Sequence, residues 1–361
     1  MIMDPDLSNL RNRFSQENMI FTHYFARMVH YALSSTERML KETMKRKWFK
    51  YAMLLLSVGI LGIISYYTYA IIQFSNQIST ASNPVKPTGS TGAAQEEVIE
   101  IPKWEGKERV NILLIGGDSR GDDAGRSDTM LVASIDPVTK SAHLFSILRD
   151  TYVDIPGHGK GRLNSAFAYG GIELTRQTIS DLLDLPIHKY VYTDFVGFIA
   201  LVDAIGGVDI EVEKDMYYTS KADKHMYDID LKQGLQHLDG KMALQYVRFR
   251  HDARSDFART ERQRILMTEV AKKMQTTSSL IKLPGILDSI APYIETDLSP
   301  KEMLKLMALG FDVNLDKVDQ QQIPPFSLLT NEKVGRAQVL GVDKNKLRQY
   351  VKELFESDAA E

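Results

Sequence analysis

The sequence predicts an α/β fold, in which a central mixed β-sheet is covered by helices and is preceded by a single transmembrane helix. Two observations support this prediction. Short apolar runs, such as the one at 110–117 that ends in two glycines, alternate with longer segments of helical length. The residues from Tyr51 to Ile72 carry no charge, and this run is long enough to cross a bilayer as a helix.

The composition limits the kinds of chemistry open to the chain. Its 361 residues suffice for one large or two modest domains. The chain has no cysteine, which excludes disulfides, thiolate catalysis and Cys-ligated metal sites. The net charge is only −3, so any basic cluster is local and the wide basic footprint of a nucleic-acid-binding protein is missing.

The residues that flank the apolar run predict its orientation. Six basic residues lie between Arg38 and Lys50, whereas the segment after the run carries almost no charge. The positive-inside rule therefore places residues 1–50 in the cytoplasm, as a basic tail, and the large C-terminal part outside. Residues 73–100 are rich in Ser, Thr, Pro and Gly and are expected to form a flexible spacer.

The outer part begins near Ile101 and predicts strands in alternation with helices. Strands are expected at 110–117, 129–136, 141–148 and 208–212, and helices at 171–184, 194–205 and 239–246. The segment 247–250 is expected to be a strand that points Arg248 and Arg250 to one side. Residues 101–275 form the predicted main domain. Residues 276–361 form a mainly helical extension, with one strand near 320–323 and a closing helix at 343–355.

An arginine cluster predicts phosphate binding. From Arg248 to Arg264 there are six arginines in seventeen residues and no lysine. The guanidinium group binds phosphate oxygens bidentately, whereas lysine acts as a point charge. One predicted helix face carries a polar patch that leads onto an apolar stripe: Arg259, Arg262, Gln263, Leu266, Val270 and Met274. The alternative is a solvated face with ion pairs, because Asp252, Asp256 and Glu261 lie among the arginines.

Two aspartates predict a cation site. Asp118 follows the first predicted strand and Asp128 opens the next, at neighbouring strand ends. Carboxylates without a Cys or His partner suit Mg²⁺ or Mn²⁺, and the alternative is a polar turn that caps backbone N–H groups. Arg120 lies beside them, and Arg149 ends a later strand. No P-loop, GxSxG or HExxH motif occurs, so the sequence lacks the motifs of the common hydrolases.

Six motifs, in this order and behind an N-terminal anchor, together resemble the LytR-CpsA-Psr family of bacterial cell-envelope proteins. They are IGGDSR (115–120), GRSDTMLVASIDP (125–137), SILRDTYVDIPG (146–157), RLNSAFAYGG (162–171), DAIGGVDIEV (203–212) and VRFRHDARSDFARTERQ (247–263). Two positions depart from the family pattern: Gly117 stands where a bulkier apolar residue is common, and Arg162 where lysine is frequent.

The resemblance implies an activity and a location. It implies a phosphotransferase that moves an anionic glycopolymer, a teichoic acid or capsular polysaccharide, from a polyprenyl-pyrophosphate carrier to a peptidoglycan sugar hydroxyl. The carrier's lipid tail is expected in an apolar tunnel between sheet and helices. The expected location is the bacterial cell membrane, as a single-pass type II protein. The expected partners are therefore the lipid-linked glycopolymer, peptidoglycan and the membrane, with no nucleic acid.

The resemblance also implies residue roles. Asp118 and Asp128 match the metal-associated aspartates. The pyrophosphate-binding set comprises Arg149, Arg248, Arg250, Arg259 and Gln263, with Arg120 and Arg262 expected beside them. The expected catalytic residues are Arg149, Arg248, Arg250, Asp128 and Asp256. Either Asp128 or Asp256 could activate the acceptor hydroxyl, or the metal could lower the pKa of that hydroxyl.

A function from a different class fits the same chain. A membrane-anchored sensor or regulator could bind the lipid-linked pyrophosphate without turning it over, and a cytoplasmic partner could bind the long basic tail. The complete set of aspartates and arginines favours the enzyme, because a sensor could lose its metal aspartates without harm.

Overall fold

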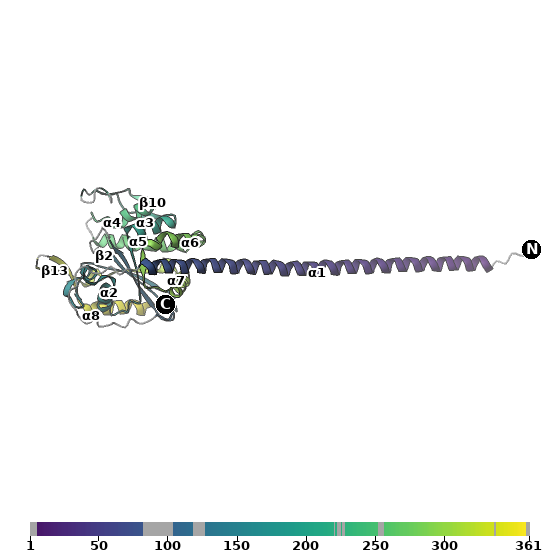
Figure 1. The fold of residues 1–361 in the computed structure, drawn as a ribbon, viewed down its shortest axis with the longest axis horizontal. Helices are drawn as coiled ribbons and strands as arrows, with labels where there is room; N and C mark the ends of the chain where they lie inside the picture. Colours follow the sequence, from purple (N-terminus) through teal and green to yellow (C-terminus); the bar gives the residue numbers. More distant parts are fainter. Residues whose placement is uncertain are drawn as a thin grey trace, which may run out of the picture. The chain divides into compact units, whose positions relative to one another are not determined.

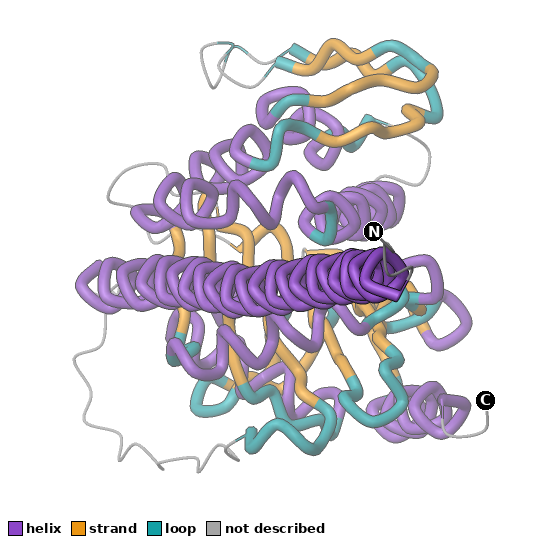
Figure 2. Tube along the Cα trace, turned by 90° about the vertical axis from the view of Figure 1, so that its right-hand side faces the viewer, coloured by secondary structure: helices purple, strands orange, loops and turns teal. Residues whose placement is uncertain are grey.

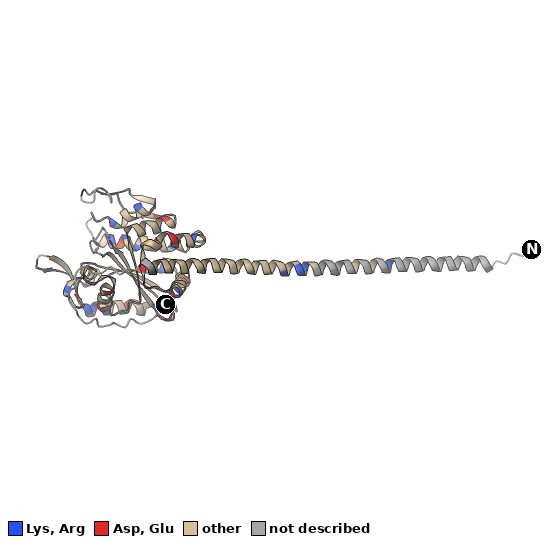
Figure 3. Cartoon of the chain, viewed as in Figure 1, with Lys and Arg blue, Asp and Glu red and all other residues tan. Residues whose placement is uncertain are grey.

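The computed structural model describes residues 6–81, 104–117, 127–219, 221, 225, 228–251, 256–335 and 337–358. The chain forms two compact units, Met1–Tyr66 and Tyr67–Glu361. The first unit consists of most of the long helix α1 (Asp6–Ala81), whose last turns belong to the second unit. Within α1 the segment Lys47–Ile78 is long and apolar enough to cross a membrane. Figure 3 shows the uncharged stretch that follows the basic residues of this helix.

The second unit is built on a six-stranded mixed sheet, with strand order β11-β6-β1-β2-β3-β12. Its strands are β1 (Val110–Gly117), β2 (Ser127–Ile135), β3 (Ala142–Ile147), β6 (Lys189–Asp194), β11 (Ile294–Thr296) and β12 (Asp319–Ile323). β1 runs antiparallel to β2 and parallel to β6, and β3 runs antiparallel to β2 and parallel to β12. The predicted fold class is therefore confirmed (Figure 1).

Alternate residues of the central strands face two different helical layers. Leu113 of β1, Val132 of β2 and Phe145 of β3 are fully buried in one core cluster. The helices α2 (Asn164–Leu183) and α8 (Lys344–Asp358) contribute Ile179 and Leu347 to the same cluster. The opposite sheet face lies against α5 (Asp256–Met274), which contacts β3 and β12. The arrangement of helices on both faces of the sheet is visible in Figure 2.

A second core cluster lies under the smaller sheets. It joins Val202 of α3 (Phe195–Ala204), Tyr246 of α4 (Gly240–Arg248) and Leu266 of α5. β7 (Val208–Val212) pairs with β10 (Gly234–Leu238), and β8 (Met216–Tyr218) pairs with β9 (Ile229–Leu231). Two further hairpins complete the unit: β4 (Tyr152–Ile155) with β5 (Gly159–Arg162), and β13 (Leu329–Val334) with β14 (Ala337–Val342).

The C-terminal segment is more integrated than the sequence predicts. It contains the expected helices α6 (Thr277–Ile290), α7 (Pro300–Asp312) and α8, and α7 begins with a capping box of Ser299 and Glu302. The segment also supplies β11 and β12 to the central sheet, where β11 pairs with β6. Strands β11, β13 and β14 were not expected, because they are short or carry no clear apolar alternation.

Two local expectations are corrected. The strand expected at 247–250 is wrong: α4 continues to Arg248, and Phe249 is its C-terminal cap. The apolar residues nevertheless face the core, because Val247 and Phe249 are buried while the two arginines are half-buried. The spacer expected at 73–100 is wrong for its first part, because α1 extends to Ala81. The rest of that prediction lies outside the described part of the chain, which omits residues 82–103.

Candidate functional site

Two neighbouring cavities lie between the central sheet and the helices on the side of the sheet that α5 contacts. The first, the polar cavity, has a volume of about 410 Å³ and is lined by residues of β1, β2, β6, α3, α4 and α5. The second, the apolar cavity, has a volume of about 500 Å³ and is lined by α1, β1–β3, α5, α6 and α7. Leu114 and Met267 line both cavities, so the two spaces adjoin at these side chains.

Four of the predicted phosphate ligands line the polar cavity. Arg248 ends α4, Arg250 follows it, and Arg259 and Gln263 lie one turn apart on α5. The Gln263 Nε2 group donates a hydrogen bond to Thr129 Oγ1 on β2 (2.8 Å), which fixes the amide against the sheet. The structure therefore brings together three arginines in the lining of one cavity whose remaining walls are mainly apolar.

Arg259 has unused hydrogen-bonding capacity. Its side chain is only 2% exposed, and its Nη2 atom lies 2.8 Å from Asp256 Oδ1. Its Nε and Nη1 atoms are buried and have no hydrogen-bond partner among the described residues. A buried donor without a partner costs about 1–3 kcal/mol. An anion in the polar cavity would satisfy these donors.

Asp256 connects Arg259 to Arg149. Asp256 opens α5, and its Oδ1 atom lies 3.6 Å from Arg149 Nε. Arg149 Nε lies 3.8 Å from Asp150, and Asp150 accepts a hydrogen bond from Arg162 Nη1 (3.1 Å). Arg149 thus lies between two carboxylates, beside the polar cavity and not in its lining. Arg162 keeps the positive charge at the position where the family commonly has lysine.

Arg262 faces away from the polar cavity. It is 2% exposed, its Nε donates to Glu213 Oε1 (2.7 Å), and its Nη1 donates to the Phe249 carbonyl (2.8 Å). It lines neither cavity, and these contacts hold it against Glu213 and Phe249, so the phosphate contact expected of it stays a prediction. Arg264 lines neither cavity either, and burial lowers its pKa.

The predicted cation ligands lie partly outside the described chain. Asp118 and Arg120 are not described, nor is the side chain of Asp128. The backbone of β2 places Asp128 at an irregularity: Gly116 pairs with Thr129 and Gly117 with Ser127, so Asp128 is the extra residue of a β-bulge. Among the described residues no group of three or more His, Cys, Asp and Glu could hold a metal ion.

Gly117, a departure from the family pattern, has a structural reason. A Cβ atom at this position would lie 2.4 Å from the Tyr192 hydroxyl of β6. The Tyr192 ring stacks on Phe167 with centroids 5.8 Å apart, so the tyrosine occupies the space that a larger residue at 117 would fill.

Several residues of the polar cavity were not predicted from the sequence. Asp194 is the N-cap of α3 and accepts a hydrogen bond from the Gly197 N–H (2.8 Å). The Arg248 guanidinium lies over the Phe195 ring, 5.1 Å from its centroid. Tyr218 and His251 stack with centroids 4.2 Å apart. The sequence offered one signal for these residues, the Asp-Phe pair at the start of a predicted helix, which marks a cap and not a ligand.

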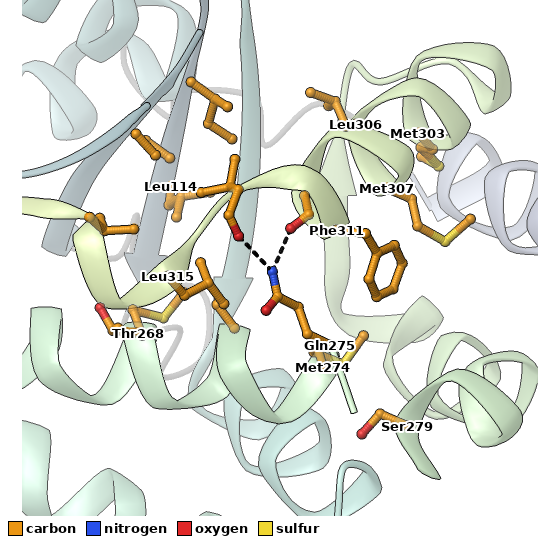
Figure 4. Close-up of a pocket in the computed structure, with 18 of the residues that line it drawn as sticks. Leu114, Thr268, Met274, Gln275, Ser279, Met303, Leu306, Met307, Phe311 and Leu315 are labelled. Atoms are coloured by element: carbon orange, nitrogen blue, oxygen red, sulfur yellow. Dashed lines mark hydrogen bonds between the residues drawn. The ribbon is translucent and has the colours of Figure 1, made fainter. Parts of the chain in front are cut away.

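The apolar cavity is lined almost entirely by hydrocarbon and thioether groups. Figure 4 shows Met303, Met307 and Phe311 on one side and Met274 with Gln275 on another. The polar end of Gln275 is not free, because Nε2 donates to the carbonyls of Gly310 (2.6 Å) and Val313 (3.1 Å). The cavity therefore suits a long apolar ligand that makes no hydrogen bonds.

The apolar stripe of α5 is rotated from its expected position. Met267, Ala271 and Met274 line the apolar cavity, whereas Val270 packs in the second core cluster. On a helix, the residues three positions and four positions after Arg259 and Gln263 both lie near the same face. The sequence alone therefore did not show which of these residues face the cavity.

Comparisons with known proteins agree with the fold. The model of the LytR_cpsA_psr family matches residues 68–356. The polyisoprenyl-teichoic acid–peptidoglycan teichoic acid transferase TagU of Bacillus cereus (strain AH820) is 36% identical over 285 residues, covering 78% of this chain and 88% of the relative. The regulatory protein MsrR of Staphylococcus aureus (strain COL) is 33% identical over 256 residues, covering 69% and 75%.

A solved structure is similar to the same part of the chain. The structure described as TagT bound to LIIa-WTA has a TM-score of 0.60 and 30% sequence identity. The similarity covers 72% of this chain and 95% of that protein.

Proposed function

The chain belongs to the LytR_cpsA_psr family and is a transferase, and we propose that it moves an anionic glycopolymer from a polyprenyl-pyrophosphate carrier to a peptidoglycan hydroxyl. The names of its relatives support transfer of a teichoic acid to peptidoglycan. The α1 helix anchors the protein in the membrane with residues 1–50 in the cytoplasm, as the basic residues before the apolar run predict.

One observation carries the proposal. Arg259, which has two buried donors without a partner among the described residues, lines a cavity together with Arg248 and Arg250, and this cavity adjoins a second one with apolar walls. A ligand that fills both spaces has an anionic group at one end and a long hydrocarbon chain at the other. Polyprenyl pyrophosphate has this chemistry, whereas a free nucleotide or sugar phosphate would leave the apolar cavity empty.

The proposed reaction is a phosphoryl transfer. The oxygen of the acceptor hydroxyl forms a bond to the phosphorus nearest the glycopolymer, the bond from this phosphorus to the bridging oxygen breaks, and polyprenyl phosphate leaves. The acceptor's proton passes to a carboxylate or to solvent. Such chemistry depends mainly on positioning and charge stabilisation. Arg248, Arg250 and Arg259 would neutralise the charge that develops on the departing lipid phosphate.

Asp256 and Arg149 have supporting roles in this proposal. Asp256 holds Arg259 by a contact of 2.8 Å and lies 3.6 Å from Arg149, so it fixes two guanidinium groups. Its role in this proposal is therefore to position these two side chains.

A divalent cation, Mg²⁺ or Mn²⁺, would be held by Asp118 and Asp128 and would supply further charge neutralisation beside the pyrophosphate. The observation that fits this role is the β-bulge at Asp128, which brings its backbone next to Gly117, the residue that directly precedes Asp118.

The test uses the full-length chain in detergent with a polyprenyl-pyrophosphate-linked glycan, a peptidoglycan oligomer and Mg²⁺. Mass spectrometry should detect the coupled glycan and released polyprenyl phosphate. The substitution Arg248→Ala should lower the rate by roughly 10²–10³, the loss expected when one charge-stabilising donor is removed. Lys241→Ala is the matched control, because Lys241 lies on the same helix and is exposed.

The same experiment separates the transferase from a sensor. A wild-type rate in the Arg248→Ala protein would remove Arg248 from the site. Donor binding without coupled product, across several glycans, would favour the regulator that one relative's name describes.

A further inference from the structure

The last turns of α1 carry an apolar stripe that is buried in the folded unit. Tyr67, Ile71, Phe74 and Ile78 recur at intervals of four, three and four residues, which places them on one helix face. Ile71, Phe74 and Ile78 are 4%, 8% and 2% exposed. The adjacent Ile72 is 45% exposed, so only this one face is covered.

A specific hydrogen bond fastens the stripe to α6. Pro284 lies inside α6 and has no N–H, so the carbonyl of Leu280, four residues earlier, lacks its usual helical partner. The Tyr67 hydroxyl donates to this carbonyl (3.1 Å). Phe74 and Ile78 then pack with Ile290 and Ala291 in a cluster of their own. The end of α1 is thus held in place by the hydrogen bond to the Leu280 carbonyl and by the apolar contacts of Phe74 and Ile78.

The same stripe forms a wall of the apolar cavity. Ile71 and Phe74 line this cavity together with Leu280 and Leu283 of α6 and Met303 of α7. Its rim is apolar as well, because the lining residue Phe311 is 41% exposed. The helix that leaves the membrane is therefore continuous with the wall of the space proposed for the lipid chain.

We propose that the segment Tyr67–Ile78 is a lipid-binding wall as well as an anchor, and that the carrier's polyprenyl chain lies against Ile71 and Phe74. This inference rests on the proposed function for the identity of the lipid. Ile71 and Phe74 are then positioning residues for the donor.

The test compares two adjacent substitutions in the full-length protein. Ile71→Trp fills part of the apolar cavity, whereas Ile72→Trp adds the same ring on the exposed side of α1. With a long-chain donor, Ile71→Trp should raise KM about tenfold, the change expected when roughly two CH₂ groups lose their burial. With a donor of only two or three isoprene units, which occupies the polar cavity alone, KM should stay within about twofold. Ile72→Trp should leave both values within about twofold.

A binding measurement keeps the inference testable without turnover. The photoreactive residue p-benzoylphenylalanine replaces Phe74 or, as the control, Ile72, and undecaprenyl phosphate is the probe. We expect a saturable crosslink at position 74, competed by excess probe lipid, and only a linear, non-saturable background at position 72.

The outcomes separate the two proposals. Equal KM values for Ile71→Trp and Ile72→Trp, or no saturable crosslink at position 74, would overturn the lipid-binding wall. An equal rise in KM for both donors would also overturn it, because general damage would explain the result. Wild-type protein that turns over neither donor would contradict the proposed reaction, while the crosslink would still decide the role of α1.

Discussion

Arg259 and Arg262 lie three residues apart on α5, and both are 2% exposed, yet the structure predicts opposite effects of removing them. Arg262 is fully engaged, because it donates to Glu213 and to the Phe249 carbonyl. Arg259 has a single charged contact, with Asp256, and two buried donors without a partner among the described residues. We expect the Arg262 side chain to stabilise the fold and the Arg259 side chain to contribute to the reaction.

The magnitudes follow from these contacts. Arg262→Met removes two hydrogen bonds that involve a charged group, at about 1.5–3 kcal/mol each. Glu213 is partly solvated, so we expect a net loss of about 2–4 kcal/mol. Arg259→Met loses the contact with Asp256 but also removes two unsatisfied donors, which cost about 1–3 kcal/mol each. Its stability should therefore stay within about 1 kcal/mol of wild type, or rise.

The assay measures melting and transfer on the same preparations in detergent. Arg262→Met should lower Tm by about 5–10 °C and keep the rate of the folded protein within about tenfold of wild type. Arg259→Met should keep Tm and lose roughly 10²–10³ in rate. A lower Tm for Arg259→Met than for Arg262→Met would refute the reasoning, since it would show that the Arg259 donors are satisfied in the free protein.

Two further predictions concern the cation and pH. EDTA or Asp128→Asn should each lower the transfer rate at least about 10²-fold while the affinity for polyprenyl phosphate stays within about tenfold, and full activity in EDTA would exclude a divalent cation from the step. Burial lowers the pKa of His188, whose Nδ1 accepts a hydrogen bond from the Asn111 N–H (3.1 Å), so the neutral form is favoured in the folded state. Stability should be complete above about pH 6.5, the ordinary pKa of histidine, and should fall as the pH is lowered below it. His188→Asn, which keeps an acceptor but cannot be protonated, should weaken this dependence of Tm on pH, and an unchanged slope would exclude His188 as its cause.

The central strands were predictable because their local pattern and their tertiary role agree. The segment 110–117 is apolar throughout, and β1 is covered on both faces. The segment 247–250 failed for the opposite reason: its alternation of arginine with Val247 and Phe249 is that of a strand, but α4 reaches Arg248 before the chain turns. The same burial pattern arises at a helix end, and four residues are too few to distinguish the two.

The candidate site shows which features could not be predicted from the local sequence. Arg248, Arg250, Arg259 and Gln263 were grouped by the sequence, and they line one cavity. Arg262 is the same type of residue at a similar helical spacing. Its side chain faces away from the polar cavity because it binds Glu213, which lies forty-nine positions earlier in the sequence. The part of the apolar cavity wall that α1 forms could not be predicted for a related reason. Its stripe continues an apolar membrane segment, so no change in composition marks the residues that dock.

In the proposed function, a single helix would determine how the head and the tail of the donor are arranged. Arg259 and Gln263 of α5 line the polar cavity, Met267 lines both cavities, and Ala271 and Met274 line the apolar one. From Arg259 to Met274 the helix rises about 22 Å, at 1.5 Å per residue. The N-terminal end of a helix favours anions, so the pyrophosphate of the proposed donor would lie at the start of α5 and its hydrocarbon chain along the later turns. With α1 as a further wall of the apolar cavity, the lipid would lie between the helix that anchors the protein and the helix that holds the phosphates, and its phosphate would stay in register with the arginines.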